Sequence, residues 1–141
     1  MKEDFELLKN LYKKDSFPKV LMLSGKKGTG KSTLINHLMF FIFDRENYDE
    51  KKNEFKINTS FYQSFLNDIF ENIIYLPGTF YRNIKIEDIR RLKQKILQTT
   101  IINKPRFIIL DDVEVFNNNS LNALLKVIEE PSEKNYFLLI C

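Results

Sequence analysis

Hydrophobic residues recur along the chain with two different spacings, one typical of helices and one typical of buried strands. Apolar positions at three- and four-residue steps predict helices over residues 5–12, 31–43, 61–70, 86–96 and 121–128. Short apolar runs predict strands over residues 20–23, 73–76, 107–110 and 136–140. Residues 44–56 are charged and show neither spacing, which predicts an exposed loop.

Prolines and small polar residues indicate where several of these elements begin and end. Pro18 ends the first helix, Pro77-Gly78 stops the second strand, and Pro131 stops the last helix. Asn117, Asn118, Asn119 and Ser120 are N-cap candidates for that last helix.

Alternation of helices with strands predicts an α/β fold, in which right-handed crossovers build a parallel sheet with helices on both faces. The strand at 107–110 is an unbroken apolar run, typical of a strand buried on both faces. The sequence stops on the hydrophobic strand at 136–140, so we expect a sheet truncated after its fourth strand. All 141 residues are assigned to one partial domain.

Composition limits the classes of protein to consider. The chain is 43% hydrophobic and 29% charged, which excludes intrinsic disorder, and its net charge of +3 permits a polyanionic partner without requiring one. Cys141 is the single cysteine, so neither a disulfide nor a cysteine-based zinc site can form within the chain. The most apolar run, Leu38–Phe43, is far too short to span a bilayer. We therefore expect a cytoplasmic protein with no membrane partner.

The most informative motif lies between the first predicted strand and the helix that follows it. Residues 25–32 satisfy G-x-x-x-x-G-K-[ST], the phosphate loop of P-loop NTPases. Glycines allow the backbone N–H groups to converge on a phosphate, Lys31 reaches the β- and γ-phosphates, and the Ser32 hydroxyl ligates Mg²⁺. The predicted ATP-binding residues are Gly25, Lys26, Lys27, Gly28, Thr29, Gly30, Lys31, Ser32 and Thr33.

Two adjacent carboxylates follow the most hydrophobic predicted strand. Asp111 would reach the carboxyl edge of the sheet and hold Mg²⁺ through its water shell. Asp112 is the candidate base that orients the attacking water, although its side chain is one methylene shorter than that of Glu. Glu114 is an alternative base, provided that the strand extends that far.

Several other residues have structural interpretations beside functional ones. His37 lies on the helix after the phosphate loop and has no partner motif, so we expect a structural role. The aromatic segment 61–70 is expected to be core, with a partner-binding surface as the alternative. A basic face on the helix at 86–96 is expected to be solvated; its residues are Arg90, Arg91, Lys93 and Lys95.

These motifs together resemble the AAA+ subunits of bacterial DNA polymerase III clamp loaders. Asn122–Pro131 is similar to the helix that follows the acidic strand in that family, and Tyr136–Ile140 is similar to the family's fourth strand. Ile86–Leu92 resembles the helix before the acidic strand. Lys31 and Asp111 are 80 positions apart, which leaves room for the extra strand that this class of ATPase carries between them.

Within that family, the chain resembles delta-prime more than gamma/tau. Only one short helix precedes Pro18, and Asp112 stands where hydrolysing relatives have Glu. Many relatives carry a four-cysteine zinc module after the first helix of the fold, which residues 44–72 replace without any cysteine. The resemblance also implies a fifth strand beside Val20–Leu23, which would otherwise be an exposed sheet edge.

The resemblance implies a function in DNA replication. The chain would bind ATP and Mg²⁺, without zinc, in a hetero-oligomeric ring that loads a sliding clamp on primer-template DNA, and Arg90 would contact that DNA. We expect weak or no ATP hydrolysis by this chain alone, with Lys31 and Asp112 as its candidate catalytic residues. The alternatives are a small-molecule or nucleoside kinase with the same phosphate loop, and a non-hydrolysing scaffold subunit of the loader.

Overall fold

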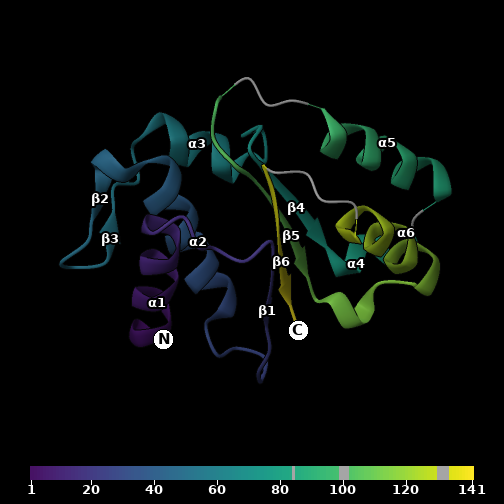
Figure 1. The fold of residues 1–141 in the computed structure, drawn as a ribbon, viewed down its shortest axis with the longest axis horizontal. Helices are drawn as coiled ribbons and strands as arrows, with labels where there is room; N and C mark the ends of the chain where they lie inside the picture. Colours follow the sequence, from purple (N-terminus) through teal and green to yellow (C-terminus); the bar gives the residue numbers. More distant parts are fainter. Residues whose placement is uncertain (84, 99–101, 130–133) are drawn as a thin grey trace. The chain divides into compact units, whose positions relative to one another are not determined.

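The structure is a computed structural model, which describes residues 1–83, 85–98, 102–129 and 134–141 (Figure 1). The chain divides into two compact units. The loop unit comprises residues 1–18 and 25–70, and the sheet unit comprises residues 19–24 and 71–141. None of the helices in these described ranges is both long and apolar enough to cross a membrane.

The loop unit is built mainly from three helices. These are α1 (Lys2–Lys13), α2 (Lys31–Phe43) and α3 (Ser60–Leu66). Between α2 and α3 lie a 3₁₀ turn (Arg45–Asn47) and a short antiparallel hairpin of β2 (Tyr48–Asp49) and β3 (Glu54–Phe55). The predictions for α1 and α2 are confirmed.

Aromatic rings form much of the core of the loop unit. Phe40 on α2 stacks on Phe55 with ring centroids 4.0 Å apart, and it meets Phe61 edge to face at 4.9 Å. Phe61 is buried, which confirms the expectation that this aromatic segment contributes to the core. Such pairs add specific geometry to the area that the rings bury.

Two predictions for the loop unit are wrong in part. The segment 44–56 is not simply an exposed loop, because its hairpin packs Tyr48 into the core with only 7% of the residue exposed. The helix predicted over 61–70 ends at Leu66, because Asp68 adopts a left-handed backbone with φ 53°. Ile69 is consequently 71% exposed rather than part of a buried helix face.

The sheet unit contains four parallel strands in the order β1-β6-β5-β4. The strands are β1 (Val20–Leu23), β4 (Ile73–Pro77), β5 (Arg106–Asp111) and β6 (Asn135–Ile140). The predicted α/β class with a parallel sheet is confirmed. β1 lies at one edge with Val20 and Met22 exposed, and within the described residues it pairs with β6 alone.

The sheet unit contains α4 (Gly78–Tyr81), α5 (Ile86–Leu97) and α6 (Asn118–Glu129), with a 3₁₀ turn at Val113–Val115. Aliphatic side chains of α5 and α6 pack against one face of the sheet. Ile108 and Leu110 of β5 are fully buried in a core that includes Ile96 and Leu124. This burial supports the interpretation of the 107–110 run as an interior strand.

The ends of the sheet-unit helices differ in detail from the predictions. α4 was not expected, since Pro77-Gly78 suggested a plain turn. Ile86 belongs to the apolar pattern that predicted the helix at 86–96, but in α5 it is 66% exposed. Asn117 caps α6 by accepting a hydrogen bond from Ser120 N–H at 2.7 Å, as one of the predicted candidates. The predicted stop at Pro131 lies outside the described residues.

A buried arginine donates hydrogen bonds to carbonyl groups at the carboxyl end of α5. The Arg106 guanidinium is 2% exposed and donates to the carbonyl oxygens of Lys95, Ile96 and Gln98 at 2.8–2.9 Å. Asn135 on β6 donates to the Ile96 carbonyl as well. A cation suits this position because the last carbonyls of a helix carry partial negative charge. Burial lowers the pKa of Arg106 below its ordinary value.

Candidate nucleotide-binding site

The phosphate loop connects β1 to α2 and has the backbone that its glycines allow. Gly25, Gly28 and Gly30 have φ angles of 152°, 83° and 87°. Residues with a Cβ rarely adopt these conformations, so the three positions require glycine. A Cβ on Gly30 would also lie 2.7 Å from the Met1 sulfur, so another side chain here would displace Met1.

Hydrogen bonds within the loop hold its shape. The Lys31 ammonium donates to the carbonyl oxygens of Gly25 at 2.7 Å and Lys26 at 2.8 Å. The Thr29 hydroxyl donates to the Lys26 carbonyl at 2.8 Å. Lys31 therefore folds its charge back over the loop, and two of its three donor hydrogens are used there.

The amino end of α2 offers further groups for an anion. Gly30 is its N-cap residue, and no side chain caps this end. Leu34 N–H bonds to the Gly30 carbonyl at 2.9 Å, whereas the N–H groups before it precede the helical hydrogen-bond ladder. Together with the helix dipole, such groups favour bound phosphate.

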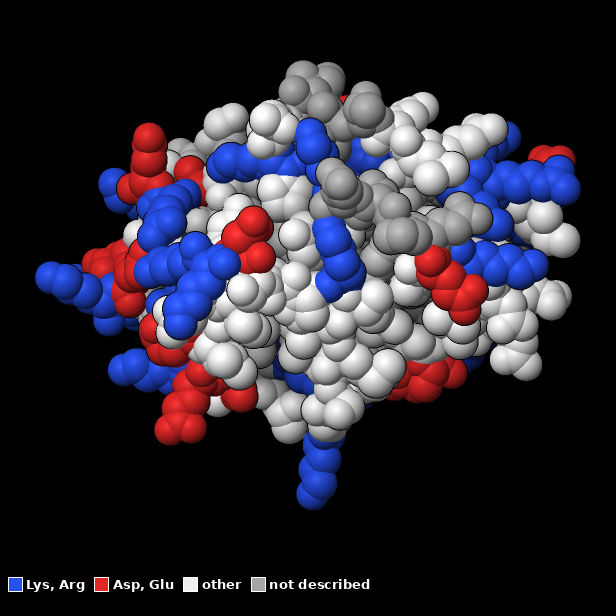
Figure 2. Space-filling view, viewed as in Figure 1, with Lys and Arg blue, Asp and Glu red and all other residues white. Residues whose placement is uncertain are grey.

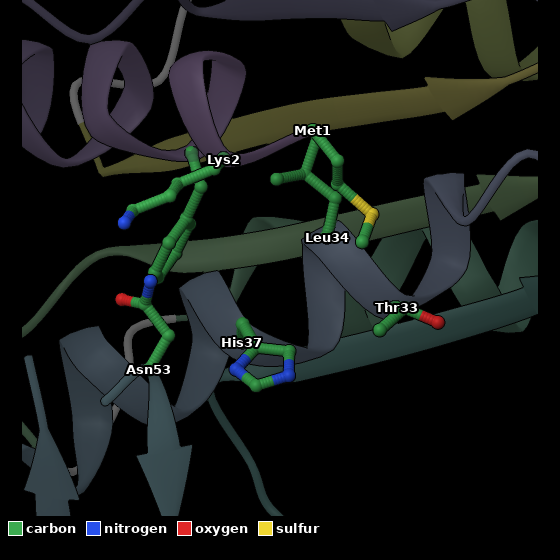
Figure 3. A pocket seen from close by; sticks show the side chains of 7 residues that line it. Met1, Lys2, Thr33, Leu34, His37 and Asn53 are labelled. Carbon is green, nitrogen blue, oxygen red and sulfur yellow. The ribbon is translucent and has the colours of Figure 1, made fainter.

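A pocket of about 220 Å³ lies beside the first turns of α2 (Figure 3). Met1 and Lys2 approach it from the start of α1, and Thr33, which directly follows Ser32, approaches from α2. Most of the pocket wall is apolar. The complete lining is Met1, Lys2, Phe5, Thr33, Leu34, His37 and Asn53. Among these residues only Thr33 was predicted from the sequence to bind nucleotide, because the pocket is formed by separate segments of the chain.

His37 has the structural surroundings that the sequence suggested. Its Nδ1 lies 2.9 Å from the Tyr48 hydroxyl, and its ring meets Phe55 edge to face at 5.1 Å. Burial lowers the pKa of His37 and raises that of Tyr48, since both charged forms lose contact with water. A neutral imidazole in an aromatic cluster is consistent with packing rather than with chemistry.

The acidic corner, Asp111 and Asp112, follows the buried part of β5. Asp111 is the last residue of the strand, and Asp112 turns the chain with a left-handed backbone at φ 52°. Glu114 lies in the 3₁₀ turn after the strand and is exposed, so the strand does not extend to it. Both aspartates are half-buried.

Two residues from β4 and the start of α4 contact this corner, and neither was predicted from the sequence to belong to the site. The Tyr75 hydroxyl on β4 donates to Oδ2 of Asp111. A Cβ on Gly78 would lie 2.4 Å from the Asp112 carbonyl oxygen and 2.8 Å from that of Asp111, so the backbones approach closely there. Tyr75 could have been noticed as a hydroxyl-bearing ring within an otherwise apolar strand.

The sheet brings the ends of two relevant strands to the same edge. β1, which precedes the phosphate loop in the sequence, and β5, which ends at Asp111, are parallel and separated only by β6. Neighbouring strands are about 4.8 Å apart, so the strand ends are about 10 Å apart. In open α/β sheets, ligands bind at the carboxyl ends of the strands, especially where the strand order reverses.

The donor groups available for Mg²⁺ are of the appropriate type. The Ser32 hydroxyl and the Asp111 carboxylate provide hard oxygen ligands, which Mg²⁺ prefers. No group of three His, Cys, Asp or Glu residues in the described ranges could hold a metal. One carboxylate with substrate phosphates is the usual Mg²⁺ site in such proteins, so the residues fit a nucleotide-dependent ion.

Arg90 lies on the exposed face of α5. Figure 2 shows Lys and Arg side chains gathered over this helix. Ile89, Leu92 and Ile96 are buried on the opposite face, so the basic residues follow the amphipathic pattern. Arg90 and Lys93 also line a shallow groove of about 120 Å³ with Ser120 and Ala123 of α6.

The family-model comparison matches residues 1–141 to the family described as DNA polymerase III, delta subunit. The chain belongs to this family. Its resemblance to bacterial DNA polymerase III clamp-loader subunits is thereby confirmed.

Individual relatives are similar over shorter stretches. DNA polymerase III subunit delta-prime of Buchnera aphidicola is 38% identical over 55 residues, which is 39% of this chain and 17% of that protein. Subunit tau/gamma of Haemophilus influenzae is 36% identical over 55 residues, or 39% of this chain and 8% of that protein. A replication factor C small subunit of Acanthamoeba polyphaga mimivirus is 25% identical across 95% of this chain and 38% of its own length.

A solved structure supports the fold. The DNA polymerase III gamma subunit-related protein of Thermotoga maritima superimposes with a TM-score of 0.63 at 20% identity. The match covers 96% of this chain and 38% of that protein. The chain thus spans less than two fifths of the length of each relative named here.

Proposed function

We propose that this chain binds ATP with Mg²⁺ as part of a delta-prime-like subunit of a DNA polymerase III clamp loader. The phosphate loop is the observation that carries the proposal. Its three left-handed glycines, the Lys31 ammonium over the loop carbonyls and the uncapped start of α2 combine the features that bind a polyphosphate.

Each part of the site has a proposed role. Backbone N–H groups of residues 25–30 surround the phosphates, and Lys31 exchanges its loop carbonyls for β- and γ-phosphate oxygens. Ser32 and Asp111 hold Mg²⁺, which neutralises charge on the phosphates. The apolar pocket beside Thr33 has room for the base.

Hydrolysis by this chain is proposed to be slow. Asp112 is shorter than the usual Glu by one methylene, about 1.5 Å, whereas a base must lie within about 2.6–3.2 Å of the proton that it accepts. Its left-handed backbone and the close approach of Gly78 limit how far it can adjust. A conformational switch requires differential ATP binding rather than rapid turnover, so such a site still suits a loader.

The partners follow from the same proposal. A cytoplasmic ring of loader subunits would place a sliding clamp on primer-template DNA, with ATP binding as the signal. Arg90 would contact DNA phosphates without reading the sequence, since an exposed guanidinium on a helix recognises charge and shape.

Calorimetry with a non-hydrolysable ATP analogue and Mg²⁺ tests the nucleotide site. Lys31→Ala removes the ammonium and should weaken binding by about 10- to 100-fold. Lys56→Ala is the matched control, because Lys56 has the same charge and an exposed position in the same unit, outside the phosphate loop. Equal effects of the two changes, or no binding by the unmodified protein, would contradict the proposal.

Product analysis separates the remaining functions. Phosphoryl transfer from ATP to a small acceptor would support the kinase alternative. Turnover in the reassembled ring that Asp112→Asn abolishes would show an active subunit, whereas unchanged ring turnover would support a scaffold role. ATP binding without transfer or turnover is the result expected for this chain alone.

A further inference from the structure

The contact between Tyr75 and Asp111 joins two neighbouring strands at the proposed metal site. In the register of β4 and β5, Tyr75 pairs with Ile109 and Pro77 pairs with Asp111. Side chains two residues apart on a strand share a face, so Tyr75 and Asp111 are diagonal neighbours on one face of the sheet. The Tyr75 ring is long enough to cover this diagonal, and its hydroxyl donates to Asp111 Oδ2.

The surroundings of Tyr75 indicate that its hydroxyl is not needed for packing. Ile74 and Leu76, on either side of it, are buried in the aliphatic core on the other face. Tyr75 itself is 40% exposed, the most exposed residue of its strand. Phenylalanine could therefore occupy this position with the ring contacts retained, and only the hydroxyl would be lost.

The backbone of the acidic corner is already fixed, but the carboxylate of Asp111 needs its own restraint. Gly78 lies against the carbonyl groups of Asp111 and Asp112. The terminal torsion of an aspartate is broad, so a carboxylate on a fixed backbone still samples many orientations. A hydrogen bond to one oxygen restricts that rotation and leaves the other oxygen available.

We infer that Tyr75 is a positioning residue for Asp111: its hydroxyl holds Oδ2 and thereby presents Oδ1 to Mg²⁺ when nucleotide is bound. The inference rests on the proposed function. Hydrogen-bond partners of ligating carboxylates orient them and tune their affinity, and loss of such a partner commonly costs 10- to 100-fold in metal affinity. Tyr75 acts through Asp111 and does not itself contact the metal.

Magnesium titration of the full chain at saturating ATP analogue tests this role. Tyr75→Phe should raise the Mg²⁺ concentration at which Mg²⁺ binding is half-maximal by about tenfold. Binding of the analogue in EDTA and the unfolding midpoint should stay unchanged. Tyr136→Phe is the matched control, because Tyr136 lies near the amino end of β6 and pairs with Phe107, at the end of the parallel strands opposite Asp111. A structural role alone would change metal-free binding and stability instead.

A double-mutant cycle identifies Asp111 as the intermediary. In an Asp111→Asn background, Tyr75→Phe should have no further effect on the Mg²⁺ dependence, because the oriented carboxylate is already lost. An undiminished effect in that background, or equal Mg²⁺ dependence in Tyr75→Phe and the unmodified protein, would overturn the inference while leaving the proposed function intact. Loss of all Mg²⁺-dependent binding in the unmodified protein would overturn both.

Discussion

The phosphate loop and the acidic corner are stabilised by contacts of very different range. In the loop unit, Lys31 and Thr29 bond to carbonyls no more than six positions away. In the sheet unit, Asp111 is held by Tyr75, 36 positions earlier, and its backbone lies against Gly78. A motif of eight residues can therefore specify the first region, whereas the second depends on correct pairing of β4 with β5.

This difference explains what the sequence predicts well and what it does not. The loop follows from its glycine and lysine spacing, and the strands follow from their apolar runs. Tyr75 and Gly78 gain their roles only through strand register, which a single sequence does not display. The hairpin of β2 and β3 was missed for a similar reason, since two-residue strands carry no periodicity and Tyr48 is buried by distant aromatic rings.

Among the changes that test this comparison, Gly78→Ala is expected to have the largest effect on stability. The new Cβ would lie 2.4 Å from the Asp112 carbonyl oxygen, and backbone cannot move as a flexible side chain would. We expect a loss of about 3 kcal/mol or more in the free energy of unfolding, as severe overpacking causes. Chemical denaturation measures the loss, with Thr79→Ala at the next position as the control. Stability equal to that control would show that the corner is less tightly packed than described.

Arg106→Leu should have the next largest effect. It removes the guanidinium that satisfies three carbonyl groups at the end of α5, and buried carbonyls without donors are costly. The expected loss is about 2–3 kcal/mol in the free energy of unfolding. Arg91→Leu on the exposed face of α5 is the control and should change stability by less than about 0.5 kcal/mol. Similar losses for both variants would refute the contribution of the Arg106 hydrogen bonds to stability.

Gly28→Ala probes the loop with a smaller change. No atom lies within 4 Å of the position that its Cβ would occupy, so the cost comes only from the left-handed backbone at φ 83°. We expect a loss of about 1 kcal/mol in the free energy of unfolding, which is well below the loss expected for Gly78→Ala. Urea titration of the two variants side by side makes the comparison, and a larger loss for Gly28→Ala would reverse our ranking of the two regions.

The smallest effect should come from pH. Burial lowers the pKa of His37 below its ordinary value of 6.5, so the unfolded chain binds the proton more readily than the folded chain does. Stability should therefore fall as pH decreases below about 6.5, and a protonated ring would also offer no acceptor to the Tyr48 hydroxyl. Unfolding measured at pH 7.5 and 5.5 should show a smaller fall for His37→Phe than for the unmodified protein. Identical falls would indicate that other groups cause the dependence.

The position of β6 has a consequence for how the chain acquires its structure during synthesis. This strand is synthesised more than a hundred residues after β1, yet it lies between β1 and β5 in the sheet. After β1 has been synthesised, more than a hundred further residues must be translated before its partner strand is present. Sheets that depend on such distant pairings fold slowly and expose apolar surface in the meantime.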